Sequence, residues 1–284
     1  MSETRTVELR ADGPVDLAAT ASLLRNHAVP GAERVAEGGR RLERLLTVDG
    51  RPWHVALQLT EEGALVTAHA EAIDRVAARV RAWLDLDSDV EAIGAALSAD
   101  PRLAASVAAR PGLRAIRYPE PFEAAVASVL GQQVSVAAAR TFAGRAVAAF
   151  GGAGPAGLRL FPSPAELLAV PLEELRAAIG VTNARARTVR AVAAAFADGL
   201  VLDAAGDLPR QRRLLLAIPG IGPWTADYLA LRLLGDPDAF PAGDLVLRRA
   251  LGGVSTAAAD AESERWRPHR AHAAFHLWAL AGAV

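Results

Sequence analysis

The sequence predicts a mainly α-helical protein that begins with a small antiparallel α+β domain. Residues 53–59 alternate apolar and polar side chains directly after an Asp49-Gly50 pair, which is typical of a β-hairpin. From Ile73 onward, apolar residues recur at helical spacing, and capping residues and glycines separate the segments. No alternating pattern returns after that point, so the sheet should be confined to the N-terminal part of the chain.

Five elements are expected in this N-terminal part. In chain order they are a helix at residues 17–24, two paired strands at 42–48 and 53–59, a third strand at 65–68 and a second helix at 73–84. Acidic residues at 85–91 then mark a boundary and the start of a new helix.

Capping signals divide the rest of the chain into helices. One helix opens at Pro121 and runs to Gln133. Residues 163–166, Ser-Pro-Ala-Glu, have the pattern of a capping box. Gly180 and Gly199 end the two helices that follow.

The composition is that of a folded protein and excludes several kinds of chemistry. Of 284 residues 52% are hydrophobic and 22% charged, and no Cys is present, so disulfides, thiolate metal sites and iron–sulfur clusters are excluded. All 31 basic residues are Arg, so no lysine can form a Schiff base. The N-terminus lacks an apolar signal segment, and no apolar run reaches the roughly 18 residues of a membrane span. We therefore expect a cytoplasmic protein without a membrane partner.

Charge is divided unevenly along the chain. Residues 1–100 carry 11 Arg against 17 Asp and Glu, whereas residues 101–284 carry 20 Arg against 15. The basic C-terminal part is compatible with a polyanionic partner such as DNA, and equally with an ordinary solvated surface.

The most informative segment is residues 214–235, LLLAIPGIGPWTADYLALRLLG. Two helices flank a Gly-rich turn, and Gly220 and Gly222 leave backbone amides exposed at a helix N-terminus. Such amides form an anion site suited to a phosphate, to which Thr225 could add its hydroxyl. The alternative is a plain αα-hairpin in which the glycines only turn the chain.

Asp244 is the candidate functional carboxylate. It follows Pro-Ala-Gly and precedes a helical run at 245–251, so it sits at a helix N-terminus, where the helix dipole favours its charged form. An ordinary N-cap is the alternative interpretation. Asp227 lies inside the helix after the Gly-rich turn, and we expect it to face solvent or an Arg.

Four separated motifs, taken together, resemble the helix–hairpin–helix DNA glycosylases, and specifically the 3-methyladenine DNA glycosylase II family. They are the hairpin at residues 218–228, the segment with Asp244 at 240–249, the segment VLGQQVSV at 129–136 and the closing helix at 264–278. The resemblance covers residues 71–284 strongly, and residues 1–70 by pattern. It implies a domain at 1–88, a helical domain with the hairpin at 119–233, and a second helical domain formed by 89–118 and 234–284.

The family resemblance implies an activity. A monofunctional DNA glycosylase would flip alkylated purines, of the 3-methyladenine and 7-methylguanine type, out of double-stranded DNA and hydrolyse the glycosidic bond. Asp244 would be the catalytic residue, and Trp224, Tyr228 and Trp278 would line the base pocket. Strand-cleaving relatives carry a Lys at the position of Trp224, so the sequence favours an enzyme that leaves an abasic site.

The resemblance also implies the DNA contacts. Gln133 stands where the family has an apolar wedge that fills the gap left by the flipped base, and it could bond the orphaned partner. Residues 11–18 contain no aromatic for the pocket where the N-terminal domain is expected to provide one. The residues expected to bind DNA are Gln133, Gly220, Gly222 and Thr225. A structural Na⁺ or K⁺ is expected on the backbone carbonyls of Leu216, Ile218 and Ile221.

Two other functions stay open on the sequence alone. One is a non-catalytic protein that binds DNA structures through the hairpin, and the other is a glycosylase for deaminated or oxidised bases. We expect no catalytic cofactor, a monomer, and a location at the nucleoid. His269, His272 and His276 share a helix face and are interpreted as packing groups rather than metal ligands.

Overall fold

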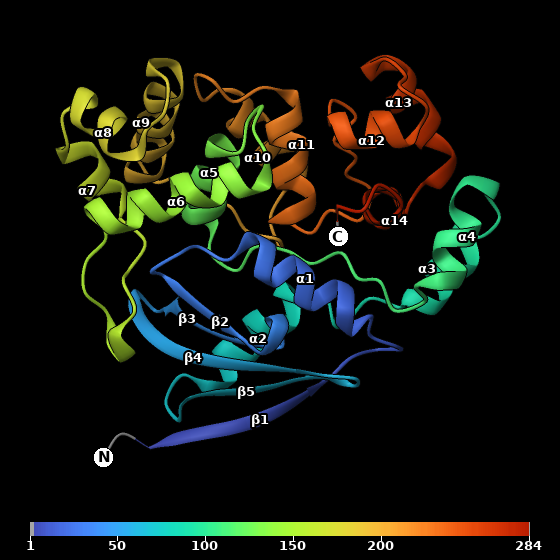
Figure 1. Ribbon diagram of the computed structural model, residues 1–284, viewed down its shortest axis with the longest axis horizontal. Helices are drawn as coiled ribbons and strands as arrows, with labels where there is room; N and C mark the ends of the chain where they lie inside the picture. Colours follow the sequence, from blue (N-terminus) through green and yellow to red (C-terminus); the bar gives the residue numbers. More distant parts are fainter. Residues whose placement is uncertain (1–2, 284) are drawn as a thin grey trace.

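A five-stranded antiparallel sheet forms one end of the molecule, and helices form the rest (Figure 1). The computed structural model describes residues 3–283 of the chain. The strands are β1 Thr4–Arg10, β2 Glu33–Ala36, β3 Arg41–Val48, β4 Arg51–Thr60 and β5 Gly63–His69. The helices of the first half are α1 Leu17–His27, α2 Ile73–Trp83, α3 Val90–Leu97, α4 Pro101–Ala109, α5 Pro121–Leu130 and α6 Val136–Phe150. Those of the second half are α7 Pro164–Ala169, α8 Leu172–Ile179, α9 Asn183–Ala197, α10 Leu208–Leu216, α11 Pro223–Arg232, α12 Leu245–Ala250, α13 Thr256–Ser263 and α14 Arg270–Leu280, with short 3₁₀ turns at Glu37–Gly39, Pro155–Gly157 and Glu264–Trp266.

The predicted fold class and β-hairpin are confirmed. Val48 pairs with Arg51 across a turn in which Asp49 has φ 51° and Gly50 has φ 72°. Positive φ at both positions is the I′ geometry that suits the twist of paired strands. The strand order is β1-β5-β4-β3-β2, so the two strands that the sequence pattern missed are both at the edges of the sheet. Their side chains are largely exposed, and they therefore lack the apolar alternation that marks β4.

Helix boundaries follow the capping chemistry of the sequence. The capping box at Ser163 and Glu166 is present, and Gly180 ends α8 in the left-handed conformation. The helix expected to reach Gln133 instead ends at Leu130, with Gly131 as its C-cap. Ser135 then caps α6, which leaves residues 131–134 as a turn between two helices. We call this turn the wedge loop.

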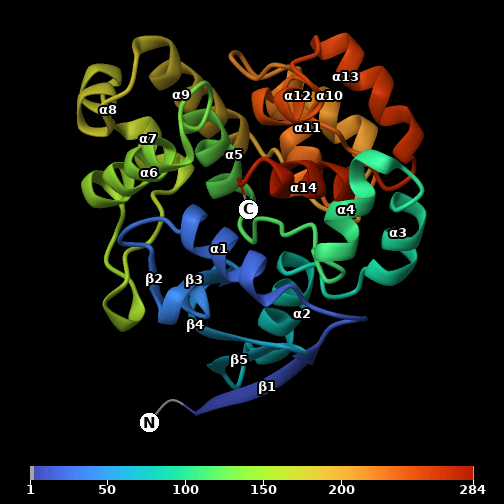
Figure 2. The ribbon, with the colours of Figure 1, turned by 45° about the vertical axis from the view of Figure 1, so that its right-hand side comes forward.

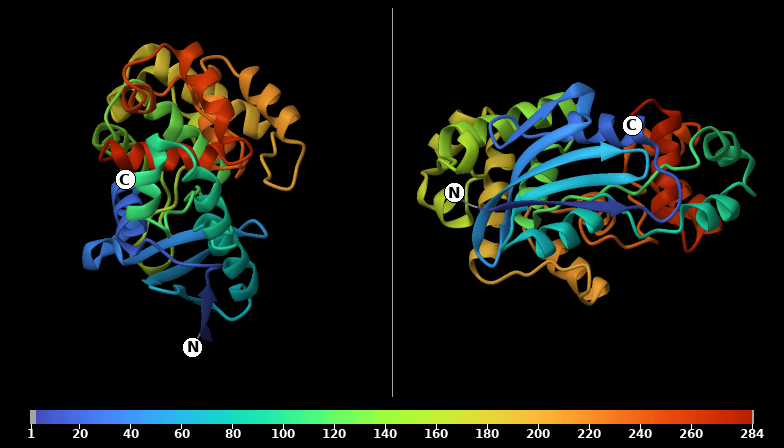
Figure 3. Two further views of the ribbon diagram at one scale, coloured as in Figure 1. Left: turned by 90° about the vertical axis from the view of Figure 1, so that its right-hand side faces the viewer. Right: turned by 90° about the horizontal axis from the view of Figure 1, so that it is seen from below.

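Two hydrophobic cores divide the molecule. The first core contains buried residues of the sheet and of α2, α3, α4, α12, α13 and α14. The second core contains buried residues of every helix from α5 through α10. Helix α11 contributes buried residues to both cores, so it lies at the junction between them (Figure 2). Helix α1 lies between the sheet and the helical part, while the N-terminal strand runs along the far edge of the sheet (Figure 3). The three-part division predicted from the sequence stays a prediction.

Buried polar contacts join α14 to α4 and to the turn that follows α2. His272 Nε2 lies 3.2 Å from Asp85 Oδ2, and His276 Nδ1 lies 3.0 Å from Ser106 Oγ. Arg117 Nη2 adds an ion pair to Asp85 at 3.0 Å. These contacts fit the interpretation of the histidines as packing groups, and residues 3–283 contain no His, Asp and Glu cluster that could hold a metal ion. No helix in that range is long and apolar enough to cross a membrane.

The burial of His276 predicts a pH dependence of stability. Desolvation, helped by the neighbouring His272 and Arg110, lowers the pKa of His276 to about 4. The unfolded chain then binds the proton first, so the contribution is complete above the unfolded pKa of about 6.5. It is lost as the pH falls from there toward 4, with a slope of about 1.4 kcal/mol per pH unit. We expect the free energy of unfolding, measured with urea at several pH values between 7 and 4.5, to depend less steeply on pH in His276→Gln than in the wild type. Equal slopes for the two proteins would contradict this assignment.

Candidate active site

Asp244 is the N-cap of α12. Its Oδ1 accepts hydrogen bonds from the amides of Val246 at 2.9 Å and Leu247 at 3.0 Å. The turn before it is closed by the Asp244 amide, which donates to the Pro241 carbonyl at 2.7 Å. The N-cap interpretation is therefore confirmed, and the cap fixes the orientation of the carboxylate. The functional role of Asp244 stays a prediction.

Two tryptophans from other helices complete the contacts of this carboxylate. Trp224 Nε1, on α11, donates to Oδ2 at 3.2 Å, and Trp278 Nε1, on α14, donates to Oδ1 at 3.3 Å. Asp244 thus receives four N–H donors, and no Arg or His of the described residues forms an ion pair with it. These donors orient the carboxylate, and no neighbouring cation among the described residues is paired with it.

The predicted aromatic residues form one continuous wall beside Asp244. Trp224 and Tyr228 stack with ring centroids 5.4 Å apart and planes at 25°. Trp278 meets Tyr228 edge-on at 6.2 Å. The i, i+4 spacing on α11 predicted that Trp224 and Tyr228 share a face, and they do. Trp278, which only the family resemblance predicted for the pocket, joins them from a distant part of the chain.

These four residues line a cavity of about 200 Å³, which we call the base cavity. The opposite wall comes from α1, α5 and α6, and includes Leu23, His27 and Val136. Residues 11–18 contribute nothing to the lining, as expected from their lack of aromatics. Helix α1 nevertheless brings an aromatic ring into the cavity, because its His27 is one of the lining residues. The imidazole lies edge-on to the ring of Tyr118, with centroids 6.4 Å apart.

Sequence reasoning missed several residues of the base cavity. His27 and Tyr118 reach it through long-range packing, for which the sequence carried no local signal. Arg232 was detectable, because it lies four residues after Tyr228 and eight after Trp224, on the same face of α11. It lines the same cavity.

The predicted anion site lies in the αα-hairpin between α10 and α11. Gly220 has φ 90°, and a Cβ there would lie 1.9 Å from Thr188 Oγ1, so both the conformation and the close approach of α9 require glycine. Gly222 is the N-cap of α11, with open space around it. Among residues 3–283 the amides of Gly220 and Gly222 have no acceptor, so they can bind an external anion.

Thr225 does not face outward as the phosphate contact requires. It is 1% exposed, and its hydroxyl accepts a hydrogen bond from Gln132 Nε2 at 3.1 Å. The same amide nitrogen donates to the Gly220 carbonyl at 3.1 Å. Thr225 therefore ties the αα-hairpin to the wedge loop, and the sequence missed Gln132 as the bridging residue.

Gln133 is exposed at the tip of the wedge loop. Its φ of 55° is a left-handed conformation that few residues other than glycine adopt. Arg185 donates from Nη2 to the Gln132 carbonyl, and Gln132 is held by the αα-hairpin, so the residue before the tip is fixed on two sides. Beside it, Val136 leaves 47% of its surface exposed.

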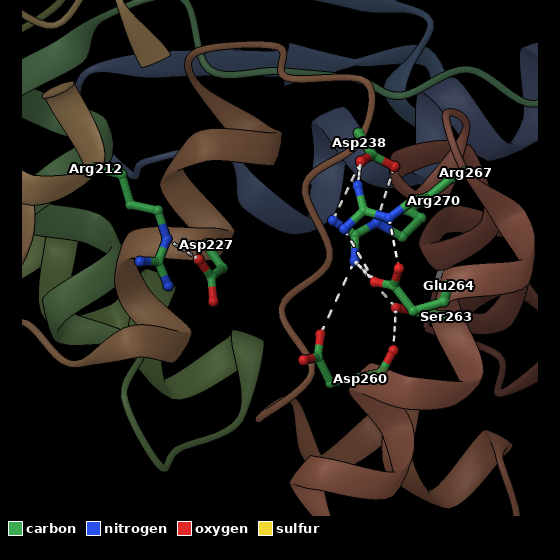
Figure 4. A network of polar contacts seen from close by, with 8 residues as sticks. All are labelled: Arg212, Asp227, Asp238, Asp260, Ser263, Glu264, Arg267 and Arg270. Atoms are coloured by element: carbon green, nitrogen blue, oxygen red, sulfur yellow. Dashed lines mark hydrogen bonds and ion pairs between the residues drawn. The ribbon is translucent and has the colours of Figure 1, made fainter. Parts of the chain in front are cut away.

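Asp227 lies outside the base cavity and pairs with Arg212 Nε at 2.6 Å (Figure 4). This contact agrees with the expectation that Asp227 faces solvent or an Arg. The ion pair joins α10 to α11 across the αα-hairpin.

A second polar network fixes the loop that leads to Asp244 (Figure 4). Asp238, in that loop, accepts from Arg270 Nε at 2.9 Å and from Arg267 Nη1. The Ala271 amide also donates to the Pro237 carbonyl at 2.9 Å. The loop before Asp244 is thereby tied to the start of α14, the helix that carries Trp278.

The carbonyls expected to hold a monovalent cation belong to the αα-hairpin. Ile218 accepts one hydrogen bond from the Ile221 amide at 3.0 Å, and within residues 3–283 no donor is found for the carbonyls of Leu216 and Ile221. Neutral carbonyl oxygens with free lone pairs are a donor set that suits Na⁺ or K⁺, so the residues present fit such an ion.

Comparison with known proteins gives the family. Residues 6–118 match the AlkA N-terminal domain, and residues 126–268 match the HhH-GPD superfamily of base excision DNA repair proteins. The chain belongs to this HhH-GPD superfamily. Within it, the N-terminal match and the sequence relatives below confirm the resemblance to the 3-methyladenine DNA glycosylase II family.

Three individual proteins illustrate the similarity. A "probable bifunctional transcriptional activator/DNA repair enzyme AlkA" from Mycobacterium tuberculosis is 46% identical over 88% of this chain and 52% of its own length. DNA-3-methyladenine glycosylase 2 from Escherichia coli is 35% identical over 62% of this chain and 63% of its own. The chain thus spans about half of the first relative and less than two thirds of the second. A 3-methyladenine DNA-glycosylase from Archaeoglobus fulgidus shares the fold, with a TM-score of 0.81 at 21% identity over 98% of both chains.

The two glycines of the αα-hairpin should respond differently to the same substitution. Gly220→Ala must push α9 away and strain the backbone, so we expect a loss of about 1–3 kcal/mol in stability and weaker binding to duplex DNA. Gly222→Ala is the matched control, since its Cβ meets nothing and its amide is retained. Urea unfolding and fluorescence anisotropy with an abasic duplex measure both effects. Equal losses for the two variants would show that the tight contact with Thr188 is unimportant.

Proposed function

We propose that the chain is a monofunctional DNA glycosylase that excises alkylated purines, of the 3-methyladenine and 7-methylguanine type, from double-stranded DNA. The observation that carries the proposal is the carboxylate of Asp244, held by two indoles at the edge of an aromatic cavity, next to a hairpin with free amides. The name of one relative, DNA-3-methyladenine glycosylase 2, supports the excision of an alkylated purine, and that of another, a DNA repair enzyme, supports a repair function.

Hydrolysis would use the carboxylate in two ways. When the glycosidic bond breaks, positive charge develops on the sugar, and the negative charge of Asp244 stabilises it. Within residues 3–283, Oδ1 accepts three hydrogen bonds, whereas Oδ2 accepts only that of Trp224. Oδ2 therefore retains lone pairs to orient a water molecule and accept its proton.

The aromatic wall accounts for the preference for damaged bases. An alkylated purine of this type is cationic, and it leaves as a neutral base without a general acid. Stacking of a cation on Trp224, Tyr228 and Trp278 contributes about 0.5–2 kcal/mol for each good contact. An undamaged neutral base gains less from the same faces.

Backbone contacts would hold the DNA without reading its sequence. The amides of Gly220 and Gly222 would bind a phosphate, with a monovalent cation on the carbonyls of Leu216, Ile218 and Ile221 supplying further positive charge. Gln133 would enter the stack as the damaged base flips out, and its amide could bond the orphaned base.

The composition argues against strand cleavage. Trp224 stands at the position of the Schiff-base lysine of strand-cleaving relatives, and the chain contains no Lys. A non-catalytic DNA-binding protein is the other candidate, because the αα-hairpin would suffice for it. That function needs neither the base cavity nor the two indoles that hold Asp244, and we therefore favour the enzyme.

Base release tests the proposal directly. The wild type should release methylpurines from alkylated duplex DNA, and strands should break only after alkali treatment. Asp244→Asn keeps an Oδ1 that can cap α12 but loses the charge, so we expect a loss of at least about 100-fold in rate with binding to abasic DNA preserved.

Each contrary result has a distinct meaning. Strand breaks without alkali would refute the monofunctional mechanism. Full activity in Asp244→Asn would refute the catalytic role. Binding of duplexes without release of alkylated, deaminated or oxidised bases would replace the glycosylase by the DNA-binding protein.

A further inference from the structure

Arg232 is a buried cation in the lining of the base cavity. It is the last residue of α11, on the face that carries Trp224 and Tyr228, and it is 3% exposed. Its guanidinium lies over the rings of Tyr118 at 5.0 Å, Phe275 at 5.5 Å and Tyr228 at 5.7 Å. The charge therefore sits in an aromatic cage that also borders the base cavity.

The guanidinium is poorly satisfied within the protein. Its hydrogen bond to a side chain is a long one of 3.4 Å, from Nη1 to the Tyr228 hydroxyl. Its Nε is buried without a partner, and no carboxylate of the described residues forms an ion pair with it. A buried donor without an acceptor costs free energy, and a buried charge without a partner costs more.

Two carboxylates that share a cavity with Arg232 are already engaged. Behind Tyr118 a smaller cavity is lined by Glu33, Glu123 and Arg232. Both carboxylates pair with Arg44, Glu123 at 2.8 Å and Glu33 at a shorter distance. Neither carboxylate is therefore free to pair with Arg232, which also lines the base cavity.

His27 supports this view of the electrostatics. Desolvation and the charge of Arg232 lower the pKa of His27 to about 3, so its imidazole is neutral at physiological pH. Its Nδ1 lies 2.9 Å from the Leu23 carbonyl and must donate to it, which leaves Nε2 as an acceptor. The lining thus offers a strong donor at Arg232 and an acceptor at His27.

We propose that Arg232 is a specificity-determining residue that donates a hydrogen bond to a carbonyl oxygen of the flipped base. Its effect is to extend excision from cationic alkylpurines to neutral bases with a carbonyl acceptor, of which hypoxanthine is the test case. The inference rests on the proposed glycosylase function.

The chemistry of the two base types differs at the leaving group. In a neutral purine nucleotide the electron pair of the C1′–N9 bond goes to the base, which leaves as an anion. Arg232 stabilises this anion through the hydrogen bond to its carbonyl oxygen. Water then adds its oxygen to C1′, and the proton it releases balances the protonation of the base. A cationic alkylpurine leaves neutral and is repelled by Arg232 before it leaves, so the residue favours one class at the expense of the other.

The experiment compares two substrates in each protein. Single-turnover release of hypoxanthine and of 7-methylguanine is measured for the wild type, Arg232→Met and Arg232→Lys. For Arg232→Met we expect the ratio of the hypoxanthine rate to the 7-methylguanine rate to fall at least tenfold. Arg232→Lys keeps a charge and a donor and should retain part of the ratio.

A second buried arginine provides the control for a merely structural role. Arg114 is 1% exposed and donates to backbone carbonyls of Asp85 at 2.7 Å and Pro14 at 3.0 Å, away from the base cavity. Arg114→Met should lower the melting temperature and leave the ratio of the two rates unchanged. Because the ratio is measured within one protein, partial unfolding of a variant cancels from it.

The outcomes separate the inference from the proposed function. A wild type that releases 7-methylguanine but no hypoxanthine contradicts the role of Arg232. So does a ratio that is unchanged in Arg232→Met, or one that Arg114→Met lowers equally. If the wild type releases neither base, the proposed function fails, and the inference fails with it.

Discussion

The carboxylate of Asp244 is the point on which the site depends. Four N–H groups hold it, two from the turn that it caps and two from indoles on α11 and α14. The two indoles are 20 and 34 residues away from Asp244 along the chain, so the packing of their helices must place each of them within hydrogen-bond distance. The donors orient a negative charge without neutralising it, and many enzymes owe most of their rate enhancement to polar groups that are already in place before the reaction begins.

The fold supplies the rigidity that this arrangement needs. Helix α11 is buried in both hydrophobic cores, and it carries Trp224, Tyr228 and Arg232 on one face. Asp238 ties the loop before Asp244 to the start of α14. On the other side of the base cavity, Gln132 links the wedge loop to Thr225 on α11. The residues proposed to hold the phosphate and fill the stack are thereby fixed to α11. Asp244, proposed to act on the sugar, is held by α11 and α14 together.

The sequence predicted what local chemistry determines. Asp49-Gly50 requires positive φ, the 163–166 segment requires a capping box, and the spacing on α11 places two aromatics together; each is present. The sequence did not predict features that long-range packing determines. These are the exposed edge strands β1 and β2, the part of the base cavity lined by α1, and the buried position of Thr225. Arg232 belongs to both groups of features. Its position on the face of α11 could be predicted from the sequence, but its lack of an ion-pair partner among the described residues could not.

Binding of a charged mimic of the sugar tests the role of Asp244 most directly. Duplexes with a cationic pyrrolidine or a neutral tetrahydrofuran in place of the damaged nucleotide differ in the charge that the reaction develops at this ring. The account predicts that the wild type binds the pyrrolidine duplex at least about tenfold more tightly, because enzymes bind such analogues better than ground states. Asp244→Asn should lose this preference. Equal affinities in the wild type, or a preference that survives in Asp244→Asn, would contradict the account.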